Sequence, residues 1–161
     1  MSSLVAMIVF ALQDIQYFDP NGTLQYSAMA ETFDADVEMA FVQEFGALQN
    51  SAFHIQDKDC SCSSLSNNHI RSLDIKFFES DFKVHTLTPQ SNFRLVSILP
   101  SLPALVIFDD NGKLAYMGPY SSGYFCGAKS SLIEPIVTTI INDEHFGALV
   151  ISDSQGCYCA L

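Results

Sequence analysis

The stretch that most constrains the fold is a short apolar run that ends in a turn with two cysteines. Residues 53–56 favour a strand, the polar turn after them contains Cys60 and Cys62, and a helical pattern begins at about Ser63. Unpaired backbone N–H groups and the helix dipole favour anions at a helix N-terminus, so thiols in this position favour the thiolate form. The sequence therefore predicts a pair of thiols placed for redox chemistry.

Length and composition predict one domain without a nucleic-acid partner. The chain has 161 residues, and 48% of them are hydrophobic, which is enough for one core and too little for two. Seven basic residues against 18 acidic ones give a formal net charge of -11. This balance argues against binding to a phosphate backbone, because little positive charge is available to neutralise it. An acidic surface of this kind favours solubility.

The N-terminal segment has two interpretations. Residues 4–12 form an apolar run of nine, about half the length of a helix that spans a bilayer, and no positive region of a signal peptide precedes them. The run is either an element packed on the core or the remnant of a membrane anchor that begins further upstream. A turn at 19–22 follows, and we therefore divide the chain into an N-terminal segment, 1–22, and a single domain with a C-terminal tail, 23–161.

Apolar periodicity predicts the order of the elements along the chain. The expected helices and strands are helices at 34–49, 63–80, 91–99 and 130–142, and strands at 53–56, 81–88, 104–108, 113–117 and 148–151. The buried stripe of the second helix is expected to consist of Leu65, Ile70, Leu73 and Phe77, with His69 beside it as a partly buried core residue. His54 and His85 are interpreted as packing or surface residues.

Five cysteines are present, and four of them form two Cys-x-Cys pairs. Beyond the first pair, the chain contains Cys126 in a glycine-rich loop and then Cys157 and Cys159 in the tail. Such usage is typical of an oxidising compartment or of a metal or redox site. The odd count leaves at least one thiol without an intramolecular disulfide partner.

The predicted order of elements resembles the thioredoxin fold over about residues 47–142. The cysteines lie at the strand-to-helix turn, where thioredoxins have Cys-x-x-Cys, and Leu102-Pro103-Ala104 precedes the buried strand, where the family has a cis-proline that faces the active-site sulfurs. The resemblance implies an α/β fold: a thioredoxin-like mixed sheet flanked by helices, with an N-terminal extension and a cysteine-bearing C-terminal tail. It also implies that Pro103 keeps a backbone edge open for substrate thiols and excludes metal.

A narrower resemblance concerns three motifs: Cys60-x-Cys62, Gly118-Pro119-Tyr120-Ser121 followed by Cys126, and Cys157-Tyr158-Cys159. Together they resemble a branch of thioredoxin-like proteins of the bacterial cell envelope. This resemblance implies a location on the periplasmic side and a tether to the inner membrane by one N-terminal helix. In that case, residues 4–12 are what remains of the tether.

The expected activity is thiol–disulfide exchange with protein thiols or disulfides, of the oxidoreductase or isomerase type. Cys60 is expected to attack and Cys62 to resolve, with Pro103 beside them and without a cofactor. A disulfide between Cys60 and Cys62 would close a very small, strained ring and be an oxidant. Two hypotheses stay open for Cys126: a bridge to Cys157 or Cys159 that fixes the tail, or one cluster of all five cysteines that relays disulfides.

Two alternatives to exchange also stay open. The domain is then either a non-enzymatic interaction module with structural disulfides, or a thiolate protein for zinc, copper(I) or an iron–sulfur cluster. Cys-x-Cys is a weak signal for structural zinc, whose usual spacing is Cys-x-x-Cys, so no metal ligands are assigned. The Asp109-Asp110-Asn111-Gly112 turn resembles a calcium loop only in composition, and its role as a hairpin turn explains it.

Overall fold

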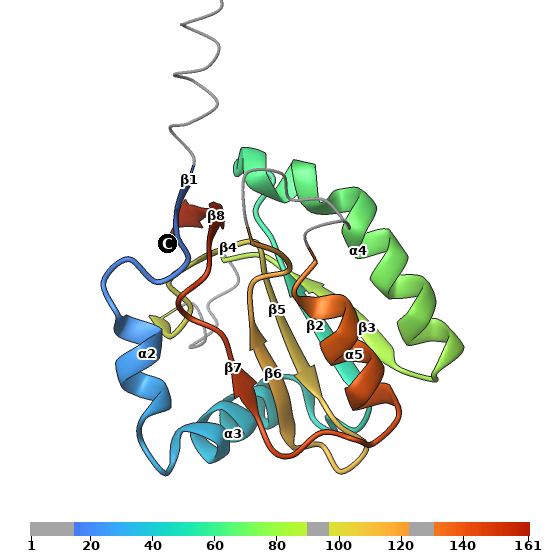
Figure 1. Cartoon of the computed structure of the whole chain (residues 1–161). Helices are drawn as coiled ribbons and strands as arrows, with labels where there is room; N and C mark the ends of the chain where they lie inside the picture. The colour runs from blue at the N-terminus through green and yellow to red at the C-terminus, as the bar shows by residue number, and fades with distance from the viewer. Residues whose placement is uncertain (1–14, 90–96, 123–130) are drawn as a thin grey trace, which may run out of the picture.

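A five-stranded mixed sheet forms the centre of the protein (Figure 1). This computed structural model describes residues 15–89, 97–122 and 131–161. The strand order is β3-β2-β5-β6-β7. Its members are β2 (Ser51–Ile55), β3 (Lys83–Leu87), β5 (Ala104–Phe108), β6 (Leu114–Gly118) and β7 (Leu149–Val150). β2 is parallel to β3 and β6 is parallel to β7, whereas β5 is antiparallel to both of its neighbours.

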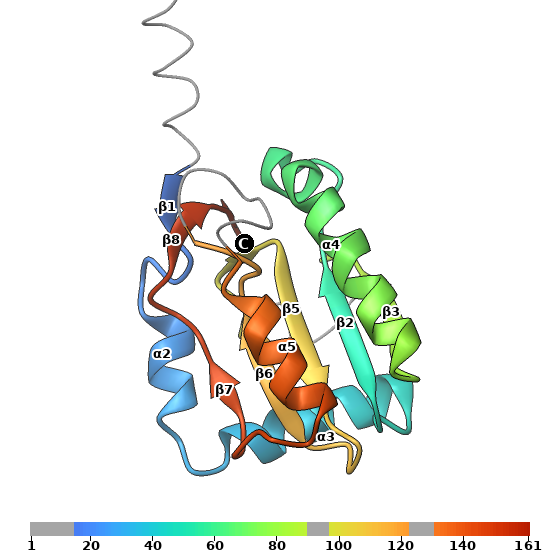
Figure 2. The same cartoon turned by 45° about the vertical axis from the view of Figure 1, so that its right-hand side comes forward.

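Helices cover both faces of this sheet, as the turned view in Figure 2 makes clear. They are α2 (Thr23–Ala28), α3 (Phe33–Phe45), α4 (Ser61–Glu79) and α5 (Ile133–Ile141). One apolar cluster joins α3, through residues such as Phe41, to alternate residues of the strands, such as Phe53 and Val106. A second cluster joins α4 and α5 to the strand residues that alternate with the first set, such as Leu105 and Ile107. The side-chain period of two in a strand separates these two layers of core.

Two small antiparallel pairs lie at one end of the sheet. β1 (Ile15–Tyr17) pairs with β8 (Gln155–Cys157), and β4 (Ser101–Leu102) pairs with β9 (Cys159–Ala160). In Figure 1, β1, β8 and the C-terminus lie together at the end of the sheet where α4 begins. The C-terminal tail therefore returns to the strand-to-helix turn that contains the first cysteine pair.

The structure confirms the expected fold class, an α/β mixed sheet flanked by helices with C-terminal cysteines, and it is compatible with a thioredoxin-like fold. Several boundaries differ from the predictions. α3 ends at Phe45 rather than near 49, because Gly46 adopts a positive φ of 76°. α4 begins at Ser61, since Cys60 already occupies the N-cap. The helix expected at 91–99 falls mostly outside the described residues.

The expected buried stripe of α4 is partly wrong. Leu65 is 62% exposed, whereas Cys62, Ser66 and His69 are buried beside Ile70, Leu73 and Phe77. The buried face of α4 is therefore partly polar in its first turns, so apolar periodicity in the sequence does not reveal it. α2 was not expected at all. The division of the chain at residue 22 stays a prediction, although Phe18 is fully buried in the core.

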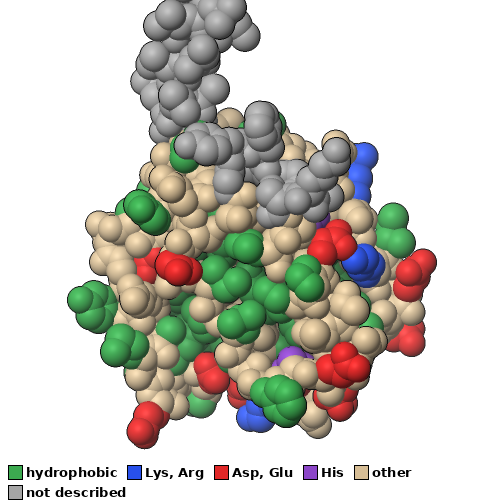
Figure 3. Space-filling model, viewed as in Figure 1, with side chains coloured by type: hydrophobic (Ala, Val, Ile, Leu, Met, Phe, Trp, Pro, Cys, Tyr) green, Lys and Arg blue, Asp and Glu red, His purple; other side chains and the backbone are tan. Residues whose placement is uncertain are grey.

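The surface is predominantly acidic, as the charge of the sequence requires. On the face seen in Figure 3, acidic side chains are spread around the periphery and do not gather over one element. Within the described ranges, no helix combines the length and apolar character needed to cross a membrane.

Candidate thiol site

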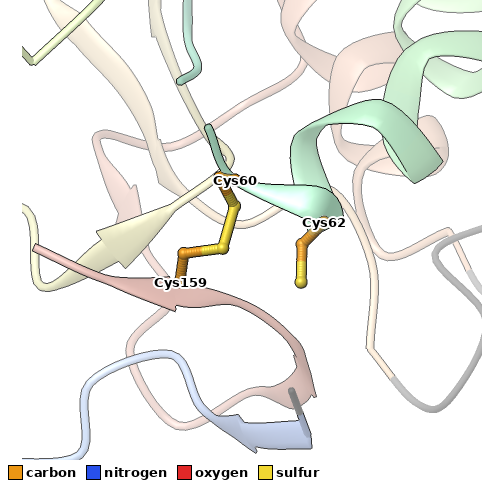
Figure 4. A group of neighbouring side chains, drawn as sticks. All are labelled: Cys60, Cys62 and Cys159. Atoms are coloured by element: carbon orange, nitrogen blue, oxygen red, sulfur yellow. A yellow bond between two sulfur atoms is a disulfide. The ribbon is translucent and has the colours of Figure 1, made fainter. Parts of the chain in front are cut away.

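Four cysteines meet at the N-terminus of α4. Cys60 is the N-cap of this helix and Cys62 lies in its first turn, while Cys157 ends β8 and Cys159 begins β9. Disulfides join Cys60 to Cys159 and Cys62 to Cys157. Figure 4 shows the first bridge with the Cys62 side chain next to it. The two Cys-x-Cys pairs are thus cross-linked to each other, pair against pair.

This connectivity corrects two expectations. Cys60 and Cys62 do not bond to each other, because each has a partner in the tail. Both tail cysteines are therefore occupied, which contradicts a bridge from the tail to Cys126. Cys126 itself lies outside the described residues. The gathering of the two Cys-x-Cys pairs into one cluster, which one hypothesis required, is confirmed for these four cysteines.

Backbone pairing explains why the tail reaches the turn. Cys159 is opposite Leu102 in the β4–β9 pair, and the carbonyl oxygen of Leu102 lies 3.9 Å from Sγ of Cys60. Cys157 is opposite Ile15 in the β1–β8 pair. Two independent strand pairs therefore place the two tail sulfurs against the helix N-terminus.

Pro103 follows a cis peptide bond after Leu102, as the resemblance implied. Leu102, which contacts Cys60 on one side, pairs with the backbone of β9 on the other. The backbone edge beside this proline is thus occupied by the chain's own tail. The role of Pro103 in binding a substrate stays a prediction.

Burial differs among the four cysteines, and it reverses one expectation. Cys60 was expected to attack external sulfur, but it is only 4% exposed, and Cys62 and Cys157 are 0% and 6% exposed. Cys159 is the one of the four that is partly exposed. Cys159 is therefore the most accessible residue of the four.

The turn before α4 is held by its own hydrogen bonds. The backbone N–H of Cys60 donates to the Asp57 carbonyl over 3.1 Å, and the N–H of Asp59 donates to the Asp57 carboxylate over 3.0 Å. The backbone N–H of Ser63 donates to the Cys60 carbonyl over 3.1 Å. These hydrogen bonds therefore fix the backbone of the turn that contains the cysteine pair.

A second polar cluster lies between the sheet and α4, and the sequence analysis missed it. His54 on β2 is 1% exposed, and its Nδ1 lies 2.5 Å from the hydroxyl oxygen of Tyr120. Its Nε2 lies 2.9 Å from Oδ1 of Asp74, with angles outside those of a hydrogen bond. Gln56 also hydrogen-bonds Tyr120. Burial, with help from Asp74, raises the pKa of Tyr120 well above its ordinary value, so this hydroxyl stays protonated.

His69 is buried, as expected, and has a definite partner. Its Nε2 lies 2.9 Å from Oγ of Ser131 and 3.9 Å from Glu134, which also forms an ion pair with Lys76. Burial lowers the pKa of His69, and Glu134 opposes that effect. His85, by contrast, stacks on Phe53 and is a packing residue.

Tyr158 anchors the tail between its two cysteines, a role that the sequence analysis also missed. Its hydroxyl donates to the Ser121 carbonyl over 2.6 Å and lies 2.7 Å from Oγ of Ser154. Its ring meets Phe18 edge to face, with 5.2 Å between centroids. The only signal in the sequence was an aromatic residue inside a Cys-x-Cys pair, which is too weak to predict these contacts.

Comparison with known proteins places the chain in a family but gives it no activity. No curated protein and no solved structure matches the chain significantly. A family model described as a domain of unknown function (DUF6436) matches residues 30–161, which include the whole central sheet and all four bridged cysteines. The chain therefore belongs to the DUF6436 family.

Proposed function

We propose that the protein performs thiol–disulfide exchange with protein thiols or disulfides through the Cys60–Cys159 bridge. The observation that supports this most is the position of the bridge. One sulfur belongs to the N-cap of α4, next to a cis-proline, and the other belongs to the partly exposed Cys159. Exchange depends on access to the attacked sulfur and on a leaving thiol of low pKa, which a helix N-terminus favours.

In the oxidising direction, a partner thiolate attacks Sγ of Cys159. A bond forms between the partner sulfur and Cys159, the Cys60–Cys159 bond breaks, and Cys60 keeps its electron pair as a thiolate. The helix N-terminus stabilises this leaving group. A second partner thiolate then attacks the partner sulfur of the mixed disulfide and releases Cys159. The partner dithiol has lost two electrons and two protons, and the two cysteines have gained them.

The reducing direction is the reverse: the Cys159 thiolate attacks a partner disulfide, and the Cys60 thiolate resolves the mixed disulfide. The attacking role expected for Cys60 thus passes to Cys159, and the resolving role expected for Cys62 passes to Cys60. Cys62 takes part in a second step, because the Sγ atoms of Cys60, Cys62 and Cys159 all lie within 4.8 Å of one another. A Cys60 thiolate at this distance attacks Sγ of Cys62 and releases Cys157, which passes the disulfide between the two pairs.

We place this activity in the bacterial cell envelope, on the periplasmic side. Two disulfides in the structure support an oxidising, extracytoplasmic compartment. A tether at residues 4–12 belongs to the same proposal, and these residues lie outside the described part of the chain.

A trapping experiment tests the exchange. Reduced full-length protein is mixed with a test protein that contains one disulfide, and mixed disulfides are identified by intact mass and peptide mapping. Cys60→Ser should accumulate a mixed disulfide at Cys159, since the resolving thiol is missing, and Cys159→Ser should accumulate much less. The matched control Cys62→Ser/Cys157→Ser removes the other bridge and should still turn over. Equal trapping by Cys60→Ser and Cys159→Ser contradicts the assigned roles.

One observation favours a second candidate function, a non-enzymatic interaction module with structural disulfides and an acidic surface for a partner. Cys60, Cys62 and Cys157 are almost fully buried, as structural bridges usually are. This candidate predicts that both bridges resist mild reductant in the folded protein. Rapid reduction of Cys60–Cys159 under native conditions excludes it.

A further inference from the structure

Three of the four bridged cysteines lie close enough to share one metal ion once their bridges are open, and the fourth is bonded to one of them. The Sγ atoms of Cys60, Cys62 and Cys159 lie within 4.8 Å of one another, and Cys157 is bonded to Cys62, which brings the fourth sulfur into the same cluster. In a tetrahedral zinc site, Zn–S bonds of about 2.3 Å hold the sulfurs about 3.8 Å apart. Opening of both bridges frees the Cys157 side chain to move into the fourth position of this geometry.

The backbone that holds these ligands does not depend on the bridges alone. Hydrogen bonds of the turn and of the first turn of α4 fix one Cys-x-Cys pair, as the bonds of Cys60 to Asp57 and Ser63 show. The other pair is fixed by the β1–β8 and β4–β9 pairs and by the buried hydroxyl of Tyr158. Reduction therefore weakens the attachment of the tail, but it leaves the contacts that place the tail pair opposite the first pair.

The chemistry of the cluster selects the class of ion. All the ligand atoms are sulfur, and among the described residues no carboxylate or imidazole joins the group. Thiolate ligands prefer soft cations such as Zn²⁺ and Cu⁺ over Mg²⁺ or Ca²⁺. The positive end of the α4 dipole offsets part of the negative charge that four thiolates leave around a divalent ion. Burial of Cys60, Cys62 and Cys157 keeps competing water away.

The cis-proline does not separate these ligands. The resemblance to thioredoxins implied that Pro103 excludes metal from the first thiol pair. In this chain Cys159 pairs with Leu102, the residue before the proline, and forms a disulfide with Cys60. The two ligands that a lone Cys-x-Cys pair lacks are thus supplied by the tail of the same molecule.

We infer that the reduced protein binds one thiophilic cation, with Zn²⁺ as its probe, through Cys60, Cys62, Cys157 and Cys159. A dithiol or phosphine reductant supplies two electrons to each bridge, the four sulfurs become thiols, and metal binding displaces their protons to the solvent. A disulfide oxidant reverses the process and releases the ion, so bridges and metal exclude each other. This inference goes beyond exchange and rests only on the opening of both bridges.

The test uses the untagged chain, reduced with a phosphine in the absence of oxygen. Zinc binding is measured by titration in competition with a chromogenic chelator. We expect one Zn²⁺ per reduced chain and none in the oxidised protein. Cys60→Ser and Cys157→Ser, one from each pair, should each weaken binding by about 100-fold or more, since even groups behind the ligands contribute 10- to 100-fold. Cys126→Ser is the matched control and should bind as the wild type does. Tetrahedral thiolate absorption of the Co²⁺ form gives a second readout.

Three results overturn the inference. They are the absence of stoichiometric zinc in the reduced wild type, whether or not its far-UV circular dichroism is retained; a loss in Cys126→Ser equal to that in Cys157→Ser; and zinc bound equally by the oxidised protein. The trapping experiment separates this outcome from that of the proposed exchange. Exchange without zinc binding contradicts only the metal site, and zinc binding without exchange contradicts only the exchange.

Discussion

The central sheet and the thiol end of the molecule are held together by different forces. The sheet is packed on both faces by apolar clusters, and all five residues of β2, β5 and β6 are buried. The thiol end consists of β1, β4, β8 and β9, which have only two or three residues each, and of the two bridges. Such short strands are not stable on their own.

This difference shows which region of the molecule a change in the redox state of the cysteines affects. Burial of apolar surface does not depend on the oxidation state of sulfur, whereas the attachment of the tail does. The sheet can therefore keep its structure while the tail is attached or released. Each of the following predictions tests whether the two regions are independent in this sense, beginning with the largest expected effect.

Opening both bridges should lower the free energy of unfolding by about 7 kcal/mol. About 5 of this comes from the loop of about 100 residues that the first bridge, with a sequence separation of 99, closes in the unfolded state, and about 2 comes from the small ring that the second bridge adds. Urea unfolding with and without a phosphine measures this change. Hydrogen exchange of the folded protein should accelerate in β8 and β9 and stay slow in β5. Equal acceleration in β5 and β9 would show that the two regions unfold together.

Phe53→Ala should cost about 4 kcal/mol, as truncation of a fully buried aromatic residue does. Phe53 lies on β2 and contacts Phe41 and Phe108 at centroid distances of 4.6 and 5.8 Å. Urea unfolding of the oxidised protein measures the loss, and Tyr26→Ala is the control, since Tyr26 is 77% exposed. The reduction rate of the bridges in the folded protein should not change; a marked increase would break the separation between the two regions.

Removal of one bridge by Cys62→Ser/Cys157→Ser should cost only about 2 kcal/mol, because Cys60–Cys159 still closes the long loop and the second bridge adds only a small ring. Thermal unfolding measures the cost, with Cys60→Ser/Cys159→Ser as the matched pair. Either double variant could instead lose as much stability as the fully reduced protein. In that case the two bridges do not close the same loop, as their nested positions in the sequence indicate that they do.

The smallest effect is a pH dependence confined to the sheet region. Burial lowers the pKa of His69 below its ordinary value of 6.5, so the unfolded chain takes up the proton more readily than the folded one. The stabilisation by neutral His69 is thus present above pH 6.5 and is lost as the pH falls below it. Unfolding from pH 8 to 5 should show a weaker dependence in His69→Gln. His85, whose pKa burial also lowers, should contribute separately in His85→Gln. An unchanged slope in both variants would assign the pH dependence to other groups.

Patterns within a single element predicted the sheet well. The continuous apolar run at 104–108 became β5 with the same bounds, because a strand buried on both faces leaves a clear mark in sequence. The turn and helix around Cys60 also followed from local chemistry. α4 began earlier than expected and buried Ser66 instead of Leu65, since packing of the helix against its neighbours, and not hydrophobicity, selects that face.

Contacts between distant segments could not be predicted. The bridges depend on β1–β8 and β4–β9, and strands of two or three residues are too short to show a period. The His54–Tyr120 contact joins residues 66 positions apart. The sequence supplied the ligands and the turn of the thiol site, but the connectivity of the sulfurs depends on how the tail folds back.

The pairing of β1 with β8 also determines how the molecule responds to force. A pull on the chain at Ile15 is transmitted across that strand pair to Cys157 and then through the covalent bridge to Cys62 at the start of α4. The tension bypasses the hydrogen bonds of the central sheet while the bridge is closed. Once the bridge is open, the same pull peels the tail from the domain, so oxidation sets the mechanical strength of this end of the molecule.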